Sequence, residues 1–202
     1  MKEKIRCPWC TKGNHEIYLK YHDEEWGTPL FDDQLLFEFL VLESFQAGLS
    51  WLTVLRKREN FRKAFSNFDA IKVSKFNQKK FDSLMQDSGI IRNRLKIEAA
   101  INNAKCFLKI QKEFGSFAKY VWSFTNGKTI VNQFKNLSDY KSKTEVSDAM
   151  SEDMGKRGFK FRGSTICYAF MQATGITDDH TADCFRKKEL AALRKKMNNN
   201  KS

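Results

Sequence analysis

The histidines and cysteines of this 202-residue chain are spaced so that they could hold a metal ion. His180 and Cys184 stand four residues apart, so on a helix both would project from one face and could form half of a zinc site. Histidine is scarce, with three in the chain, which makes these positions informative. The N-terminal region supplies further candidate ligands: Cys7, Cys10, His15 and His22.

Two sets of four ligands are compatible with this spacing. One set joins His180 and Cys184 to Cys7 and His22 and would tether the two ends of the chain. The other set consists of Cys7, Cys10, His15 and His22. Spacing alone slightly favours this local set, because closing a short loop costs less entropy. A third interpretation has no metal and buries His180 and Cys184 in the core. Two thiolates and two imidazoles would make a closed, structural site, which argues against a zinc-dependent hydrolase.

A second group of residues combines aromatic rings with one carboxylate. Glu43 lies in the otherwise apolar segment 40–51, where a carboxylate is costly unless it is paired or functional. Rings around a carboxylate suit a pocket for a base flipped out of a duplex, because rings stack on the base and the acid reads its amine. The alternative is that the rings are core and that Glu43 forms a salt bridge with a nearby Arg or Lys. The rings lie within the first 51 residues, at Trp9, Tyr18, Tyr21, Trp26 and Trp51.

Helices must position these side chains. Proline occurs only at positions 8 and 29, and apolar residues recur at helical spacing, so the sequence predicts an all-α body. Asp32 or Asp33 can cap a helix that ends near Gly48, and Ser50 can cap the next helix, whose cations, Arg58 among them, should face solvent. Further helices are expected at about 69–76, 78–87, 92–114, 116–124, 144–157 and 166–173. The segment 125–143 is expected to be an irregular, exposed crossover.

Two glycines in a basic segment predict a tight turn between helices. Gly158 and Gly163 lie within Lys156–Thr165, where they would close one helix and open another. Backbone amides of such a turn could hold a phosphate. The alternative is a helical hairpin with a solvated basic rim.

The composition favours a folded protein with a polyanionic partner. The net charge of +12 and the isoelectric point near 9.5 point to nucleic acid first and to an anionic membrane surface second. Hydrophobic residues make up 41%, which favours one folded unit over residues 1–202 with an unstructured end at 198–202. Five cysteines without a secretory context argue against a disulfide framework. Without a segment of about 20 apolar residues or a signal peptide, we expect a cytoplasmic protein that does not insert into membranes.

The most specific indication of function comes from several segments that follow one another from about Cys7 to Cys184. They are Arg6–Trp9, Tyr18–Gly27, Glu43–Trp51, Gln86–Arg92, Phe117 with Val121–Phe124, Lys156–Thr165, Tyr168 with Phe170–Ala173, and Asp179–His180. Together they resemble the bacterial constitutive 3-methyladenine-DNA glycosylases of type I, divergent helix-hairpin-helix DNA glycosylases in which a structural zinc joins the two chain ends. The resemblance implies a base-excision enzyme that flips out 3-methyladenine and releases it hydrolytically from alkylated double-stranded DNA.

The resemblance also implies roles for individual residues. The structural Zn²⁺ falls on Cys7, His22, His180 and Cys184, with Cys10 and His15 left in a short insertion. Glu43 matches the carboxylate that reads the base. Tyr21 and Trp51 match the walls of the base pocket, and further lining rings fall on Trp9, Tyr18 and Trp26.

Other implied residues contact the duplex. Gly48 and Leu49 match a wedge that fills the space vacated by the flipped base. The hairpin spans Gly158 to Ser164, and its expected DNA contacts are Lys160, Arg162, Gly163 and Ser164. Ser164 stands where glycosylases that also cut the backbone have a lysine nucleophile, so an enzyme without lyase activity is implied. We also expect a monomer. Phe45 stands where the family usually has Gln, so the outer pocket is expected to differ.

One acidic residue has two interpretations. Asp178 falls at the position where the wider helix-hairpin-helix superfamily has an Asp that acts on the sugar, although the type I family is understood to lack it. The alternative, which we favour, is that Asp178 caps a helix starting near His180 and that Asp179 orients the zinc-bound His180. We therefore expect Glu43 to dominate the chemistry.

Overall fold

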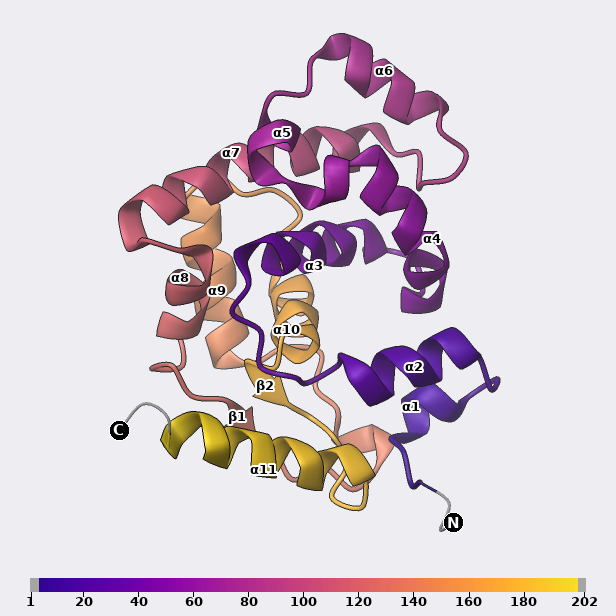
Figure 1. The fold of residues 1–202 in the computed structure, drawn as a ribbon, viewed down its shortest axis with the longest axis vertical. Helices are drawn as coiled ribbons and strands as arrows, with labels where there is room; N and C mark the ends of the chain where they lie inside the picture. The colour runs from indigo at the N-terminus through magenta and orange to yellow at the C-terminus, as the bar shows by residue number, and fades with distance from the viewer. Residues whose placement is uncertain (1–3, 200–202) are drawn as a thin grey trace.

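Helices form nearly all of the regular structure (Figure 1). The structure is a computed structural model that describes residues 4–199. The α-helices are α1 (Pro8–Thr11), α2 (Glu16–Glu24), α3 (Asp33–Gln46), α4 (Trp51–Ala64), α5 (Ala70–Ser74), α6 (Gln78–Gln86), α7 (Arg94–Phe114), α8 (Phe117–Ser123), α9 (Glu145–Lys156), α10 (Ser164–Ala173) and α11 (Phe185–Asn199). The short elements are the 3-10 helices η1 (Ser66–Phe68) and η2 (Leu137–Asp139) and the strands β1 (Ile130–Val131) and β2 (Thr177–Asp178). The predicted all-α body is confirmed.

Side-chain caps set the starts of the two helices that lead to the candidate pocket. The carboxylate of Asp32 accepts a hydrogen bond from the Leu35 amide at 2.8 Å, and the Ser50 hydroxyl accepts one from Thr53 at 3.2 Å. Both predicted caps are therefore confirmed, because each satisfies an amide that has no partner inside its helix.

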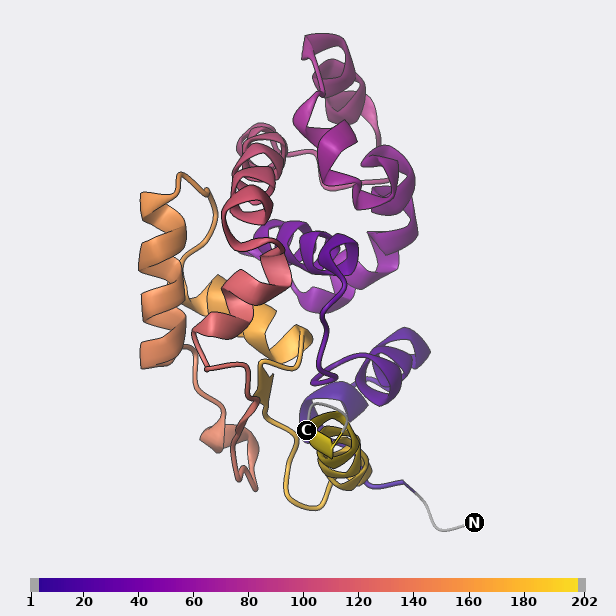
Figure 2. The same cartoon turned by 60° about the vertical axis from the view of Figure 1, so that its left-hand side comes forward.

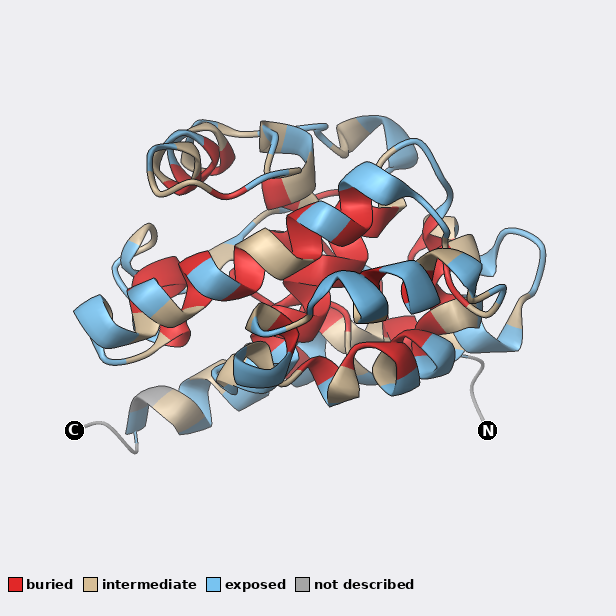
Figure 3. Cartoon of the chain, turned by 90° about the horizontal axis from the view of Figure 1, so that it is seen from above, coloured by how far each residue is buried: buried red, intermediate tan, exposed pale blue. Residues whose placement is uncertain are grey.

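Helix α3 forms the centre of the core, and every residue from Leu36 to Phe45 is buried. It packs against α4, α7, α8 and α10. Figure 3 shows the buried residues gathered in these central helices, with exposed residues on the outer ones. A helix that is covered on all sides can bring a side chain from any face into a buried site.

The segment predicted as an exposed crossover is held to the core by backbone pairing. Strand β1 pairs in parallel with β2, with Ile130 opposite Thr177, and Phe134 forms a further bridge to Thr181. The side chain of Phe134 is buried. Most of 125–143 is exposed, as predicted, but the pairing with β2 and the burial of Phe134 were not predicted, since pairing between distant residues leaves little signal in the local sequence.

The C-terminal region forms a helix that begins at Phe185, later than the predicted start near His180. Helix α11 runs to Asn199, so the first two residues of the predicted unstructured end are helical, whereas 200–202 lie outside the described residues. The amide of Phe185 donates to the carbonyl of Ile5 at 3.0 Å, which joins the start of α11 to the N-terminal segment. Between residues 4 and 199, no helix is both long enough and apolar enough to cross a membrane.

Candidate functional site

Glu43 and all five aromatic residues of the second group line one cavity of about 310 Å³. The rings come from α1, α2, the turn that follows α2, and the first residue of α4, whereas Glu43 comes from the last turns of α3. The remaining lining residues were not predicted from the sequence, and they are Gln46, Leu137, Tyr140, Ala169 and Gln172. The sequence could have pointed to two of them. Gln172 lies in a segment that carries the family resemblance, and Tyr140 is an aromatic residue in the irregular segment.

The rings of the cavity support one another. Trp9 packs edge-on against Trp26 with ring centroids 4.9 Å apart and against Tyr18 at 5.2 Å. Tyr21 lies 5.4 Å from Trp51. Such contacts hold aromatic walls in place before any ligand arrives.

Several buried polar atoms of the cavity lining have no hydrogen-bond partner within the described residues. They include the indole nitrogens of Trp9 and Trp51 and one carboxyl oxygen of Glu43. Buried polar atoms in proteins are nearly always hydrogen-bonded, and exceptions call for an explanation. These atoms are available to a ligand that supplies both hydrogen-bond donors and acceptors.

Burial controls the charge of Glu43. The residue is 4% exposed, and desolvation raises the pKa of its carboxyl group to about 8. The carboxyl group of the free protein is therefore mostly neutral at pH 7. No salt bridge involves Glu43 within residues 4–199, so the alternative in which an Arg or Lys pairs with it is wrong.

The salt bridge that was considered for Glu43 forms instead at Glu38, five residues earlier on α3. Arg58 and Arg62 of α4 both donate to the carboxylate of Glu38, and Arg58 also pairs with Glu25 at 2.8 Å. Arg58 is buried, so the prediction that it faces solvent is wrong. Two carboxylates hold this guanidinium inside the protein, and that arrangement cannot be read from the helical pattern of α4.

Phe45 does not line the cavity. Its ring is fully buried and packs 4.8 Å from Phe61 and 6.0 Å from Phe65. The expectation that Phe45 changes the outer pocket is therefore not supported, and the adjacent residue Gln46 lines the cavity in its place.

A tight turn separates α3 from α4 at the edge of the cavity. The amide of Leu49 donates to the carbonyl of Gln46 at 2.6 Å, with Ala47 at φ −47° and ψ 116° and Gly48 at φ +77°. This geometry is that of a type II β-turn, which requires a positive φ at its third residue and so favours glycine there. Leu49 is 42% exposed. We call residues 46–49 the wedge turn.

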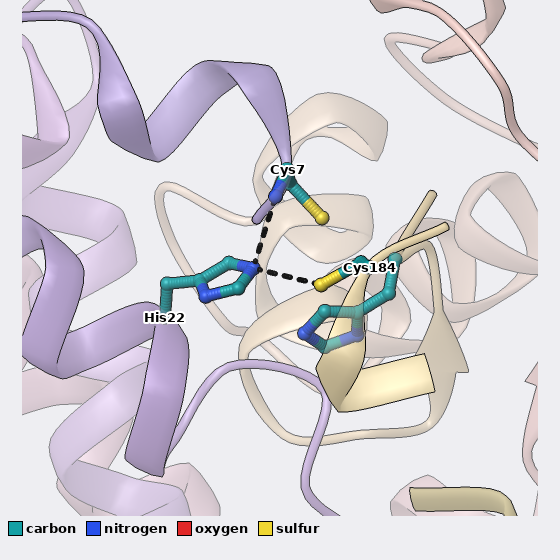
Figure 4. Close-up of side chains that lie close together, drawn as sticks. Cys7, His22 and Cys184 are labelled. Atoms are coloured by element: carbon teal, nitrogen blue, oxygen red, sulfur yellow. Dashed lines mark hydrogen bonds between the residues drawn. The ribbon is translucent and has the colours of Figure 1, made fainter. Parts of the chain in front are cut away.

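The second candidate site is a buried cluster of two cysteines and two histidines. The potential ligand atoms of Cys7, His22, His180 and Cys184 all lie within 4.8 Å of one another. Figure 4 shows three of these side chains converging, with Nε2 of His22 3.4 Å from the Cys7 amide nitrogen and 3.5 Å from Cys184 Sγ. The thiol of Cys10 donates to the carbonyl of Cys7 instead, and neither Cys10 nor His15 belongs to the cluster. The local ligand set is therefore wrong.

Carboxylates orient both histidines of the cluster. Asp23 contacts Nδ1 of His22 at 2.8 Å, and Asp178 contacts Nδ1 of His180 at 3.1 Å. This arrangement directs the Nε2 atoms inward, and Nε2 of His180 is buried with no hydrogen-bond partner within the described residues. Two sulfur and two nitrogen donors fit a tetrahedral metal such as zinc. Gly27 keeps room for the cluster, since a Cβ there would lie 2.6 Å from Cε1 of His180.

Three expectations about this region are wrong. His180 and Cys184 do not share a helix but lie in the connection between β2 and α11. Asp178 lies in β2 and does not cap a helix near His180, because α11 begins only at Phe185. Asp178, not Asp179, orients His180. Asp179 is instead fixed by hydrogen bonds from Asn132, Tyr168 and Gln172 at 2.6–2.7 Å. The chain turns sharply after β2, so sequence proximity does not indicate which carboxylate faces the imidazole.

The basic glycine segment forms the loop between α9 and α10, residues 157–163, which we call the hairpin loop. Lys160 and Gly163 are exposed, and Ser164 begins α10. Arg162 turns back over Gly155 of α9, where its guanidinium also donates to the Ser151 hydroxyl at 3.3 Å. Of the predicted DNA contacts, Lys160 is thus the cation that projects into solvent, whereas Arg162 is half-buried.

Comparisons with known proteins agree on one family. The family described as methyladenine glycosylase matches residues 9–187. A DNA-3-methyladenine glycosylase of Haemophilus influenzae is 52% identical over 179 residues, which cover 89% of this chain and 96% of the relative. DNA-3-methyladenine glycosylase 1 of Escherichia coli is 48% identical over 179 residues, covering 89% and 95%. A crystal structure of a 3-methyladenine DNA glycosylase I variant in complex with 3-methyladenine superposes with a TM-score of 0.86 at 39% identity, covering 88% of this chain and 96% of that one.

Proposed function

This chain belongs to the methyladenine glycosylase family and is a DNA-3-methyladenine glycosylase, and from that premise we propose that it excises 3-methyladenine from alkylated double-stranded DNA in the cavity around Glu43. The observation that carries this assignment is a buried carboxyl group in an aromatic cavity, with no partner among residues 4–199. The volume of about 310 Å³ accommodates a flipped base, and the rings offer faces for stacking.

The chemistry of the lesion explains how such a cavity can be selective. Adenine methylated at N3 is cationic while it is attached to deoxyribose, so its glycosidic bond is weakened and the base leaves as a neutral molecule. Stacking of the cation on Trp51 or Tyr21 favours the lesion by about 0.5–2 kcal/mol. A hydrogen bond from the base amino group to a desolvated Glu43 adds about 1.5–3 kcal/mol. Normal adenine is neutral and gains no cation–π contribution.

The raised pKa of Glu43 links lesion binding to proton release. A cationic base beside the carboxyl group favours its ionised form. Because burial raises the pKa to about 8 in the free protein, a proton must leave when the cationic base enters at pH 7. The resulting carboxylate stabilises positive charge on the base and on the oxocarbenium-like sugar as the bond breaks.

We expect base excision without strand cleavage. A lyase step needs an amine nucleophile at the hairpin, and the first residue of α10 is Ser164, whose hydroxyl cannot form a Schiff base. Incubation with duplex DNA that contains an abasic site should leave both strands intact.

The DNA interface that we propose consists of the wedge turn and the hairpin loop, and it makes α9 and α10 a helix-hairpin-helix unit. Leu49 is an apolar, exposed side chain on a constrained turn at the cavity edge, which suits insertion into a duplex. Replacing Lys160 by Ala should reduce the slope of log K for DNA binding against log salt concentration by about one. Replacing Lys160 and Arg162 together should reduce it further, whereas Lys195→Ala on α11 serves as a matched control. A salt slope unchanged in the double variant would remove the hairpin loop from the interface.

The cluster of two cysteines and two histidines is proposed to hold one structural Zn²⁺. Four protein ligands leave no position for substrate, so the metal would stabilise the fold by joining the N-terminal segment to the segment before α11. Elemental analysis should find one zinc per chain. Cys184→Ser should lose the metal and lower the melting temperature, whereas Cys10→Ser should retain both. The opposite pattern would contradict this assignment.

Base release from methylated DNA is the direct test of the proposed function. Chromatography of the products should show 3-methyladenine, and a DNA-binding protein without chemistry would bind the same duplex and release nothing. Since one chain lines the whole cavity, we propose that the protein acts as a monomer and a single catalytic unit. We also propose that it acts in the cytoplasm. Analytical ultracentrifugation tests the oligomeric state.

A further inference from the structure

Helix α7 holds the wedge turn through a buried lysine. Lys96 is 6% exposed, and its ammonium group donates to the carbonyls of Phe45 at 2.8 Å and of Ala47 at 2.6 Å. Within residues 4–199 no carboxylate pairs with this ammonium group. A buried ammonium group is costly unless its hydrogen atoms find acceptors, and the carbonyls at the C-terminal end of α3 supply them here. Breaking these two hydrogen bonds should therefore be unfavourable. They fix the backbone on both sides of Gln46.

The same helix holds the hairpin loop through a buried asparagine. Asn103 is 1% exposed, and its amide makes two bonds to the backbone of Lys160. Its oxygen accepts from the Lys160 amide at 2.8 Å, and its nitrogen donates to the Lys160 carbonyl at 2.9 Å. The neighbouring Asn102 donates to the carbonyl of Gly158 at 2.8 Å. One side chain thus fixes both polar backbone groups of a residue at the tip of the loop.

Lys96 and Asn103 lie on one face of α7. Seven residues make about two helical turns, so the two side chains are separated by about 10 Å along the helix axis. Helix α7 contains no proline or glycine between Arg94 and Phe114, and it is capped by Asn93 at its start and by Gly115 at its end. Figure 2 shows α7 beside the loop that joins α9 to α10 and beside α3. An uninterrupted helix therefore sets the spacing between two loops that are more than 100 residues apart in sequence.

We propose that Lys96 and Asn103 are positioning residues for excision, which hold the wedge turn and the hairpin loop at a fixed spacing so that one duplex engages both. This proposal rests on the proposed function. Neither residue lines the cavity, so each would act through the backbone that it holds. Insertion of Leu49 must coincide with the grip of the hairpin loop on the phosphates, and a displacement of about 1 Å in such an arrangement can lower a rate about 100-fold.

The test compares variants that remove these bonds with a variant that only weakens the same helix. Lys96→Met removes the donors and keeps the length of the side chain, and Asn103→Leu keeps the volume and removes both bonds. Lys96→Arg retains a cationic donor, and Asn103→Asp retains the acceptor for the Lys160 amide. Ile110→Ala is the control, because Ile110 is a buried residue of α7 whose apolar side chain bonds neither loop.

Three measurements separate positioning from general destabilisation. Single-turnover excision at saturating DNA should fall about 100-fold for Lys96→Met and Asn103→Leu, after correction for the folded fraction. Binding of free 3-methyladenine, followed by tryptophan fluorescence, should be unchanged for Asn103→Leu, because Asn103 holds Lys160, which does not line the cavity. Fluorescence of 2-aminopurine beside the lesion should report reduced unstacking. Lys96→Arg should recover most of the rate, and Asn103→Asp should fall between wild type and Asn103→Leu.

Two results would overturn the positioning role. One is excision by Lys96→Met and Asn103→Leu at the rate of Ile110→Ala. The other is a parallel loss of free-base binding by Asn103→Leu, which would show that the cavity itself had changed. If wild type released no base, the proposed function would fail, yet the unstacking signal of the same variants would still decide whether α7 sets the spacing of the two loops.

Discussion

Helix α3 carries two buried carboxyl groups, Glu38 and Glu43, whose surroundings are opposite. Glu38 is 3% exposed and accepts hydrogen bonds from Arg58 and Arg62. Glu43 is 4% exposed, faces an aromatic cavity and has one oxygen without any partner in the described structure. The two residues share a helix, a residue type and a degree of burial, so they differ only in what the neighbouring elements bring to them.

The difference separates a group that stabilises the fold from one that serves a ligand. A paired buried carboxylate supports its partners, and removing it leaves their charges uncompensated. An unpaired one is costly to the fold and available to a bound molecule. Asp178 resembles Glu38 in this respect, because it is fully buried and contacts His180, Lys187 and Arg194.

The largest expected effect is on excision by Glu43→Gln. Glutamine keeps the shape but cannot carry the negative charge that stabilises the cationic base, so single-turnover excision at saturating DNA should fall about 10²–10³-fold. Glu38→Gln is the matched control on the same helix and should retain nearly the full rate in its folded fraction. Equal losses of rate in the two variants would show that Glu43 has no special role in excision.

The next effect is on stability, where Glu38→Gln should cost more than Glu43→Gln. Glu38→Gln leaves Arg58 with Glu25 alone and removes the shared partner of Arg62, so unfolding in urea should require about 3 kcal/mol less free energy. Glu43→Gln breaks no ion pair and should not destabilise the protein at neutral pH. A destabilised Glu43→Gln protein would show that the carboxyl group has a partner within the fold.

The dependence of stability on pH should reveal the same contrast. The folded-state pKa of Glu43 is raised to about 8 from a usual value of 4.5, so the folded protein binds the proton more tightly than the unfolded chain. This contribution is present in full below pH 4.5 and is lost as pH rises towards 8, at up to about 1.4 kcal/mol per pH unit. The stability difference between Glu43→Gln and wild type should therefore grow in favour of the variant across this range. A constant difference would show that the pKa of Glu43 is not raised.

The smallest expected effect is on excision by Asp178→Asn. The side chain does not line the cavity, and its carboxylate is engaged by His180 and two cations, so excision should fall by less than about tenfold. Metal content and folded fraction need to be measured on the same sample, because Asp178 holds His180. A loss larger than that of Glu43→Gln would make Asp178 the acid that acts on the sugar.

Local sequence determined where most helices begin and end. Asp32, Ser50 and the apolar spacing between them set α3 and the start of α4 because caps and helical periodicity act within a few residues. The family resemblance implied that Cys7, His22, His180 and Cys184 form one ligand set, and these four side chains do cluster, although spacing alone favoured the local set. It also pointed to Glu43 and the rings that line the cavity with it.

Only the tertiary structure decided which of these groups have partners. It paired Arg58 with Glu38 rather than with solvent, turned Phe45 into the core, and placed Asp178 rather than Asp179 against His180. It also brought Gln172 to the cavity from more than 100 residues away along the chain. Helix caps depend on neighbours in sequence, whereas the pairing of a buried charge depends on which distant elements pack against it.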